Sequence, residues 1–398
     1  MKAEELYRTP NGIAHHYSQF RVSERLLFTG HSHQAWPDCA MDGQVQAWHD
    51  AARYVDHKWE HAFARAARVK KGYAGLLEDD PQNITLGSNT HELVVKFLSA
   101  LPLGDRPRLI TTDGEFHTIR RQLDRLEEEG VEIVKVPTHP PDRIVERTLK
   151  LIDDRTAAVL MSKVFFNSGI IVHGLDELAQ RCRRSGAEFL VDAYHALNVV
   201  PFSVKQEKLE SAFIVGGGYK YCQMGEGNCF LRVPPDCSRR PVVTGWFAEF
   251  ETLATAHESE KVPYPRNAER FAGSTYDPTC HYRASEVFAF FEKQRLTPDL
   301  LRTVSQHQIK CLMDDFDDLD LDPGVIQYDK TIPMQDRAGF LVLHTPNAHF
   351  IQKTLVEHGV LTDCRDTALR FGPAPYLSDR QLSEAMRILG EVINTMLR

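Results

Sequence analysis

The chain has 398 residues, of which 42% are hydrophobic and 26% charged, a composition typical of a globular protein with a sizeable core. The formal net charge of −8 argues against a nucleic-acid partner, which would require a basic face. No apolar run approaches the roughly 20 residues of a transmembrane helix, and the N-terminus lacks the apolar stretch of a signal peptide. We therefore expect neither a nucleic-acid nor a membrane partner.

The eight cysteines are scattered along the chain, without a C-x-x-C pair and without the spacing of a zinc site. This pattern predicts reduced thiols, no bound metal and a cytoplasmic protein.

From about residue 83 the chain alternates short β-rich runs with helical patterns. Several runs are apolar throughout, which is typical of strands buried on both faces of a mostly parallel sheet. We expect strands at 83–87, 108–112, 131–136, 157–162, 188–192, 211–216 and 228–232. We expect helices near 91–101, 116–130, 175–185 and 284–296. This strand–helix–strand order predicts βαβ units.

The pattern changes to α+β after about residue 297. The expected elements are a helix at 301–315, a strand at 340–345, a helix at 346–358, a β-rich segment at 359–373 and a helix at 378–396. We expect residues 1–50 to join this small domain and cover the cleft, 51–296 to form a large domain, and 297–398 to form the small one.

A carboxylate and a lysine stand at the ends of two consecutive predicted strands, where they could act on one ligand. Asp192 ends one apolar run, and a glycine-rich turn bearing Lys220 follows the next. In open α/β sheets, ligands bind beyond the carboxyl ends of strands. Alone, Asp192 could cap a helix and Lys220 could be a surface charge. Together they match pyridoxal 5′-phosphate (PLP), which needs a lysine amine and a carboxylate beside its pyridine nitrogen.

PLP also requires a phosphate-binding site and an aromatic ring that stacks on its pyridine, and the starts of two predicted helices offer candidates for both. Asn89 and Thr90 stand where a strand gives way to a helix, and such a helix N-terminus can hold a phosphate, although simple capping would also explain them. Phe116 or His117 could stack on the pyridine ring, and Phe116 could equally be a core aromatic.

With these residues in place, the chain resembles the class V, aminotransferase-fold PLP enzymes, and among them the kynureninases, over roughly residues 25–385. The segments that carry the resemblance are DAYHALNVVPF (192–202), GGGYKYCQMGEG (216–227), TGWF (244–247), RFAGST (270–275) and DCRDTALRFGPAPY (363–376). The resemblance implies the aspartate aminotransferase type I fold, with a mostly parallel seven-stranded sheet in a large domain and a small α+β domain.

The resemblance also implies roles for individual residues. Lys220 is the Schiff-base lysine and the base at Cα, Asp192 pairs with the pyridinium nitrogen, and Tyr219 is a candidate proton donor. Arg370 binds the substrate α-carboxylate, with a salt bridge inside the small domain as the alternative. The other implied cofactor and substrate contacts are Asn89, Thr90, Phe116, His195, Trp246, Thr275 (or Ser274) and Ser32.

Trp246 and Thr275 are implied to reach the phosphate from the neighbouring subunit of a homodimer with shared active sites. Simple packing is the alternative for Trp246. The chain departs from the family at two places. It has Phe-His-Thr-Ile at 116–119 where the family has Phe-Pro-Ser/Thr-Asp, and GHSHQAWP at 30–37 where the family has GNSLG.

The implied activity is hydrolysis of an L-kynurenine-like amino acid at the Cβ–Cγ bond, giving L-alanine and an anthranilate. One alternative is another class V reaction, by an aminotransferase or a cysteine desulfurase. A desulfurase needs a reactive loop cysteine, and Cys364, its candidate, stands in an expected strand. The other alternative is a PLP-fold protein that binds its ligand without turnover.

Overall fold

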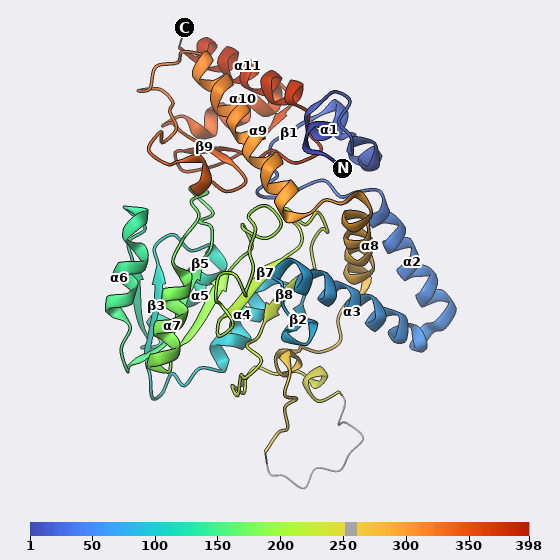
Figure 1. The fold of residues 1–398 in the computed structure, drawn as a ribbon, viewed down its shortest axis with the longest axis vertical. Coiled ribbons are helices and arrows are strands. Elements are labelled where there is room, and N and C mark those ends of the chain that lie inside the picture. Colours follow the sequence, from blue (N-terminus) through green and yellow to red (C-terminus); the bar gives the residue numbers. More distant parts are fainter. Residues whose placement is uncertain (251–260, 398) are drawn as a thin grey trace.

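The computed structural model describes residues 1–250 and 261–397. Figure 1 shows a central sheet with its helices in the lower part of the view, and α9, α10 and α11 together with the N-terminal α1 above it. Helices α2, α3 and α8 lie side by side at one flank of the sheet.

The central sheet has seven strands in the order β2-β8-β7-β6-β5-β3-β4. All neighbouring pairs are parallel except those that β8 makes with β2 and β7. The predicted mostly parallel seven-stranded sheet is therefore confirmed. Its strands are β2 (Ile84–Gly87), β3 (Arg108–Thr112), β4 (Glu132–Val136), β5 (Thr156–Ser162), β6 (Glu188–Asp192), β7 (Phe213–Gly217) and β8 (Cys229–Arg232).

Strand β5 explains why the sheet is sandwiched between helices. All seven of its residues are buried. Val159 and Met161 belong to one apolar cluster and Ala158 and Leu160 to another, because successive side chains of a strand point to opposite faces. The helices around the sheet are α2 (Cys39–Tyr54), α3 (Lys58–Leu77), α4 (Thr90–Ser99), α5 (His117–Glu128), α6 (Ile144–Leu151), α7 (Leu175–Ser185) and α8 (Thr279–Gln294).

The sequence of helix α7 explains both its buried face and the residue at which it ends. Leu175, Leu178, Ala179 and Cys182 are buried at helical spacing and form its inner face. The helix ends at Gly186, whose φ of 69° places it in the left-handed conformation that glycine adopts without strain.

The C-terminal part is α+β, as the sequence predicts. Its three-stranded sheet has the order β11-β12-β9 and is antiparallel. Short strand β1 pairs with β10, so the N-terminal segment contacts this part. Its elements are α1 (Ala3–Tyr7), β1 (Leu26–Leu27), α9 (Pro298–Asp318), β9 (Leu341–His344), α10 (Ala348–Glu357), β10 (Val360–Leu361), β11 (Asp363–Arg365), β12 (Ala368–Phe371) and α11 (Asp379–Met396).

The division into three domains stays a prediction, and one helix runs across a predicted boundary. Helix α2 passes through residue 50 and packs against α8, where a Cβ on Gly43 would lie 2.7 Å from the carbonyl oxygen of Tyr282. No helix of the described residues is long and apolar enough to span a bilayer. Each of the eight cysteines, all within the described ranges, is unpaired.

Candidate active site

The sheet topology brings Asp192 and Lys220 together. Strands β6 and β7 are parallel neighbours with Asp192 opposite Val215, so Asp192 and the turn after β7 lie at one sheet edge. The glycine that ends β7 allows close packing. A Cβ on Gly217 would lie 2.5 Å from the Tyr194 hydroxyl, too close for any other residue.

The Lys220 amine is buried among a histidine and three aromatic rings. Its Nζ lies 2.8 Å from His195 Nε2. The same nitrogen lies 4.8 Å from the ring centroid of Tyr194, 5.3 Å from that of Phe116 and 5.6 Å from that of Tyr219. Burial lowers the pKa of Lys220 to about 7, although Asp192 opposes the shift. A large fraction of the amine is therefore unprotonated near neutral pH, as a nucleophilic lysine requires.

Asp192 and His195 are both buried near this amine. Burial raises the pKa of Asp192, against the Tyr194 backbone N–H that donates to its carboxylate at 2.9 Å and against the charge of Lys220. Burial, and then the charge of Lys220, lower the pKa of His195 well below its ordinary value. The imidazole is therefore neutral and can accept a hydrogen bond from the lysine.

Arg370 reaches the site from strand β12 and carries a salt bridge. Its Nε and Nη2 donate to the two carboxylate oxygens of Asp363 at 2.8 and 2.6 Å, and Nη1 donates to the Phe166 carbonyl oxygen at 2.6 Å. The alternative interpretation of Arg370 is thus present in the structure. These three hydrogen bonds leave two of the five guanidinium hydrogens of Arg370 for another acceptor. Arg370 is near enough to Lys220 to contribute to the lowering of its pKa.

Asp363 also binds the N-terminal loop, through His31. The His31 ring lies 2.9 Å from Asp363 through Nε2 and stacks on Phe340 at 4.6 Å between centroids. A Cβ on Gly372 would lie 2.2 Å from His31 Nδ1, which explains the glycine that follows Arg370 and Phe371. Burial lowers the pKa of His31 to about 4, so the ring is neutral at pH 7.

The rest of the N-terminal loop reaches Tyr219. The Ser32 hydroxyl lies 3.1 Å from His33 Nδ1, and the His33 ring stacks on Tyr219 with 4.9 Å between centroids and 19° between planes. Ser32 therefore approaches the site through His33, and the loop that carries it contacts both Tyr219 and Asp363.

Helix α4 points its N-terminus toward the same region. The Asn89 side chain accepts from the Glu92 backbone N–H at 2.9 Å, so the capping interpretation of Asn89 is present in the structure. The Thr90 backbone N–H contacts the thiol of Cys229, which in turn lies 3.8 Å from the Tyr194 hydroxyl. A cavity of about 410 Å³ opens beside this helix end, with Ser88 and Thr275 among the lining residues.

The segment just before helix α5 contributes Phe116 and the buried carboxyl group of Glu115. Phe116 precedes the first turn and faces Lys220, whereas His117 is exposed. Ile119, which stands where the family has an aspartate, is fully buried in an apolar cluster. Glu115 accepts from the Ser162 hydroxyl at 2.6 Å and from the Thr112 hydroxyl at 2.7 Å.

The environment of Glu115 favours its protonated form. Burial raises the pKa of Glu115 to about 7, although the hydrogen bonds from Ser162 and Thr112 oppose the shift. Ser162 is the partner of Asp192 in the β5–β6 register, so a second carboxyl group lies near Asp192.

Trp246 lies apart from the Lys220 cluster. It opens a short 3-10 helix, η6 (Trp246–Glu249), and packs edge to face on Phe247 with 4.5 Å between centroids. Its side chain is 42% exposed. Within the described residues, its ring contacts join it to Phe247 and Phe250 and not to Lys220.

The sequence does not single out Asp363, His31, Glu115 or Tyr194. For Asp363 a signal exists, because Asp363 and Arg370 face each other across a hairpin closed by Asp366 and Thr367. Cross-strand partners of opposite charge are expected to pair. Glu115 and His31 carry no such signal, because only the fold shows that they are buried.

Two family models match the chain. The model described as aminotransferase class V matches residues 43–225, which include Asp192 and Lys220. The model described as the kynureninase C-terminal domain matches residues 301–389, which include Asp363 and Arg370.

Curated relatives match about half of the chain. A mitochondrial cysteine desulfurase from Candida maltosa is 26% identical over 199 residues, covering 48% of this chain and 40% of the relative. Cysteine desulfurase IscS from Rickettsia africae (strain ESF-5) is 28% identical over 200 residues, covering 48% of each chain. The chain thus matches less than half the length of these relatives.

Solved structures share the fold over nearly the whole chain. The apo cysteine desulfurase from Thermococcus onnurineus NA1 has a TM-score of 0.80 at 14% identity, covering 97% of this chain and 98% of that one. A C-DES mutant with glycine covalently linked to its PLP cofactor has a TM-score of 0.81 at 16% identity, covering 95% of this chain and 98% of that one. At this identity the likeness shows the fold alone.

Proposed function

We propose that this class V PLP enzyme, whose C-terminal part matches the kynureninase C-terminal domain, hydrolyses the Cβ–Cγ bond of L-kynurenine or a related aryl-keto amino acid. The products would be L-alanine and an anthranilate. One observation carries the proposal. Arg370, inside the segment that matches the kynureninase C-terminal domain, lies 5.9 Å from the Phe340 ring centroid. The same ring lies 6.3 Å from His195, which contacts the Lys220 amine at 2.8 Å.

The residues around Lys220 fit PLP. The amine is buried with a pKa of about 7, the buried Asp192 carboxylate stands at the end of the neighbouring strand, and Phe116 offers a ring face. When bound, PLP supplies an electron sink for the substrate Cα. Asp192 would hold a proton at the pyridine nitrogen, and the free Lys220 amine would accept the proton from Cα.

Tyr219 is suited to give a proton back. Burial raises the pKa of Tyr219 to about 12, so its hydroxyl keeps the proton at neutral pH. Its ring contacts the His33 ring at 4.9 Å and the Tyr194 ring at 4.8 Å between centroids. We assign it the protonation of the substrate Cβ after bond cleavage.

Arg370 is assigned the substrate α-carboxylate. Its two uncommitted guanidinium hydrogens can fork onto a carboxylate while Asp363 holds the opposite edge. Ser32, on the loop that His31 fastens to Asp363, is assigned a contact to the same substrate.

We further propose a homodimer with shared active sites. Val242, Trp246 and Phe250 expose 82%, 42% and 48% of their surface. Trp246 and Phe250 lie 5.4 Å apart between ring centroids, and neighbouring exposed apolar side chains are a feature of protein interfaces. A second copy seated there would bring Trp246, and Thr275 from the adjacent cavity, toward the partner's phosphate site.

A second candidate is cysteine desulfuration, because desulfurases are among the curated relatives and the structural neighbours. The cysteine that a desulfurase would need is poorly placed in the C-terminal part of this chain. Cys364 lies in strand β11, and burial raises the pKa of its thiol, which disfavours the reactive thiolate.

The test is anthranilate fluorescence after PLP-loaded protein is mixed with L-kynurenine. We expect a rise that Lys220→Ala abolishes and that Lys205→Ala, an exposed-lysine control, retains. No rise with intact visible cofactor absorbance would reject the kynureninase proposal. Parallel reactions with L-cysteine would detect sulfide, and amino acids with keto acids would detect transamination. Loss of sulfide release in Cys364→Ala would favour the desulfurase.

A further inference from the structure

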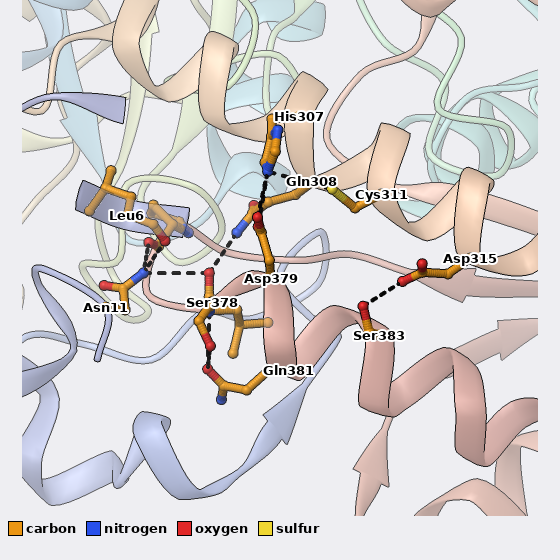
Figure 2. Close-up of polar contacts among 12 residues, drawn as sticks. Leu6, Asn11, His307, Gln308, Cys311, Asp315, Ser378, Asp379, Gln381 and Ser383 are labelled. Carbon is orange, nitrogen blue, oxygen red and sulfur yellow. Dashed lines mark hydrogen bonds and ion pairs between the residues drawn. The ribbon is translucent and has the colours of Figure 1, made fainter. Parts of the chain in front are cut away.

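Three different metal-ligand atoms converge where α9 meets the first turn of α11, outside the Lys220 site. His307 and Cys311 are four residues apart on α9, so their side chains share one face of the helix. Asp379 is the first residue of α11. Figure 2 shows His307 pointing from α9 to Asp379, with the sulfur of Cys311 beside them.

The distances place all three groups around one point. His307 Nε2 lies 2.9 and 3.0 Å from the two carboxylate oxygens of Asp379. Cys311 Sγ lies 3.5 Å from the same nitrogen. All three ligand atoms lie within 4.8 Å of one another.

Hydrogen bonding accounts for only part of this arrangement. A single imidazole nitrogen donates one hydrogen or accepts through one lone pair, so it cannot serve a carboxylate and a thiol equally. A tetrahedral zinc ion, with Zn–N of about 2.05 Å and Zn–S of about 2.3 Å, separates the nitrogen and sulfur ligands by about 3.5 Å. The observed separation of Cys311 Sγ and His307 Nε2 is 3.5 Å. The Asp379 carboxylate would need to retreat from His307 by about 0.5 Å and to lie about 3.6 Å from Cys311 Sγ. The three ligand atoms already lie within 4.8 Å of one another.

We propose that His307, Cys311 and Asp379 form a zinc site that joins α9 to α11. Nitrogen, sulfur and oxygen ligands together select a borderline ion such as Zn²⁺ over Mg²⁺ or Ca²⁺. A thiolate and a carboxylate neutralise the two positive charges of the ion. Three protein ligands leave a fourth position for water or another ligand.

The surroundings favour such a site. The Tyr7 ring stacks on His307 at 3.7 Å between centroids and 16° between planes, which fixes the imidazole. The side chains of His307 and Asp379 are 31% and 43% exposed, so an ion has access from solvent.

The experiment uses Co²⁺ as a spectroscopic probe on the PLP-loaded, chelator-treated full chain. Tetrahedral Co²⁺ bound to a thiolate gives visible d–d bands, which Zn²⁺ should abolish by displacement. We expect one equivalent in the wild type and in Cys364→Ser, a control on another partly buried cysteine. Cys311→Ser should lose the bands, and Asp379→Asn should bind at least tenfold more weakly.

Two results would overturn the proposal. One is the absence of tetrahedral bands in the wild type. The other is their persistence in Cys311→Ser, which would assign them to another thiol or to the cofactor. Urea unfolding without metal checks that each variant folds. If Cys311→Ser does not fold, His307→Gln takes its place, with the same loss expected.

Discussion

The salt bridge between Asp363 and Arg370 offers a test of how the site is held together. Asp363→Asn removes the charge but keeps the shape. Arg370 has only 4% of its side chain exposed and Asp363 has 21%, so the variant leaves a buried guanidinium without its counter-ion. Removing one partner of a buried pair costs about 3–5 kcal/mol. Because Asp363 is partly exposed, we expect a loss of about 3 kcal/mol in the free energy of unfolding at pH 7.

The pH dependence carries a definite sign. Burial raises the pKa of Asp363, but hydrogen bonds from His31 and Arg370 outweigh it and hold this pKa below its usual range. The carboxylate therefore stabilises the fold fully above its unfolded pKa of about 3.9, and this contribution is lost as the pH falls toward its folded pKa. The difference between wild type and Asp363→Asn should shrink below about pH 4.

The assay is urea unfolding of the PLP-free protein, together with KM for the turned-over amino acid. Asp366→Asn is the matched control, since Asp366 sits at the exposed turn of the same hairpin with a φ of 51°, a conformation asparagine tolerates. If Arg370 binds the substrate carboxylate, loosening it should raise KM about tenfold, or about 1.4 kcal/mol. If the free energy of unfolding of Asp363→Asn lies within about 0.5 kcal/mol of that of Asp366→Asn, the reasoning is refuted, because ordinary surface substitutions change stability by that much.

Three further predictions concern the buried ionisable groups. The rate of PLP capture by the cofactor-free protein should rise with pH, reach half its maximum near pH 7, the pKa of Lys220, and level off above about pH 8; a rise that continues toward pH 10 would contradict the lowered pKa. In the wild type the raised pKa of Glu115 makes its ionisation unfavourable in the fold, so the free energy of unfolding should fall by roughly 3 kcal/mol as the pH rises from about 4.5 to 7. Glu115→Gln should lack this fall. A variant whose urea curves change with pH as the wild-type curves do would contradict the prediction. Tyr219→Phe should lower kcat about 100-fold with unchanged cofactor absorbance; full activity would remove it as the proton donor.

The sheet was predictable because its strands are apolar runs that end in recognisable turns. Strands β3 and β6 match the expected ranges to the residue, as does helix α7. Helices α2 and α3 were not predicted. The inner face of α2 buries Ala40 and Gly43, whose small side chains give little apolar periodicity. Contact with α8, and not a hydrophobic stripe, holds this helix in place.

The candidate site was predictable where strand ends carry unusual residues, as with Asp192 and Lys220. It was not predictable where a role depends on burial. Glu115 precedes Phe116 in a sequence that looks polar, yet it is 2% exposed. The expectation of no metal depends on the spacing of cysteines along the chain. That criterion does not detect the proposed zinc site, because its ligands lie on two helices far apart in the sequence.

Both the cofactor assignment and the proposed reaction require that Lys220 is the lysine that holds PLP. Borohydride reduction of the PLP-loaded protein fixes the cofactor to its lysine, and peptide mapping then identifies the labelled residue. We expect one pyridoxyl group, on the peptide that contains Lys220. A label on another buried lysine, such as Lys96 or Lys163, or no label on a protein that shows visible cofactor absorbance, would contradict it.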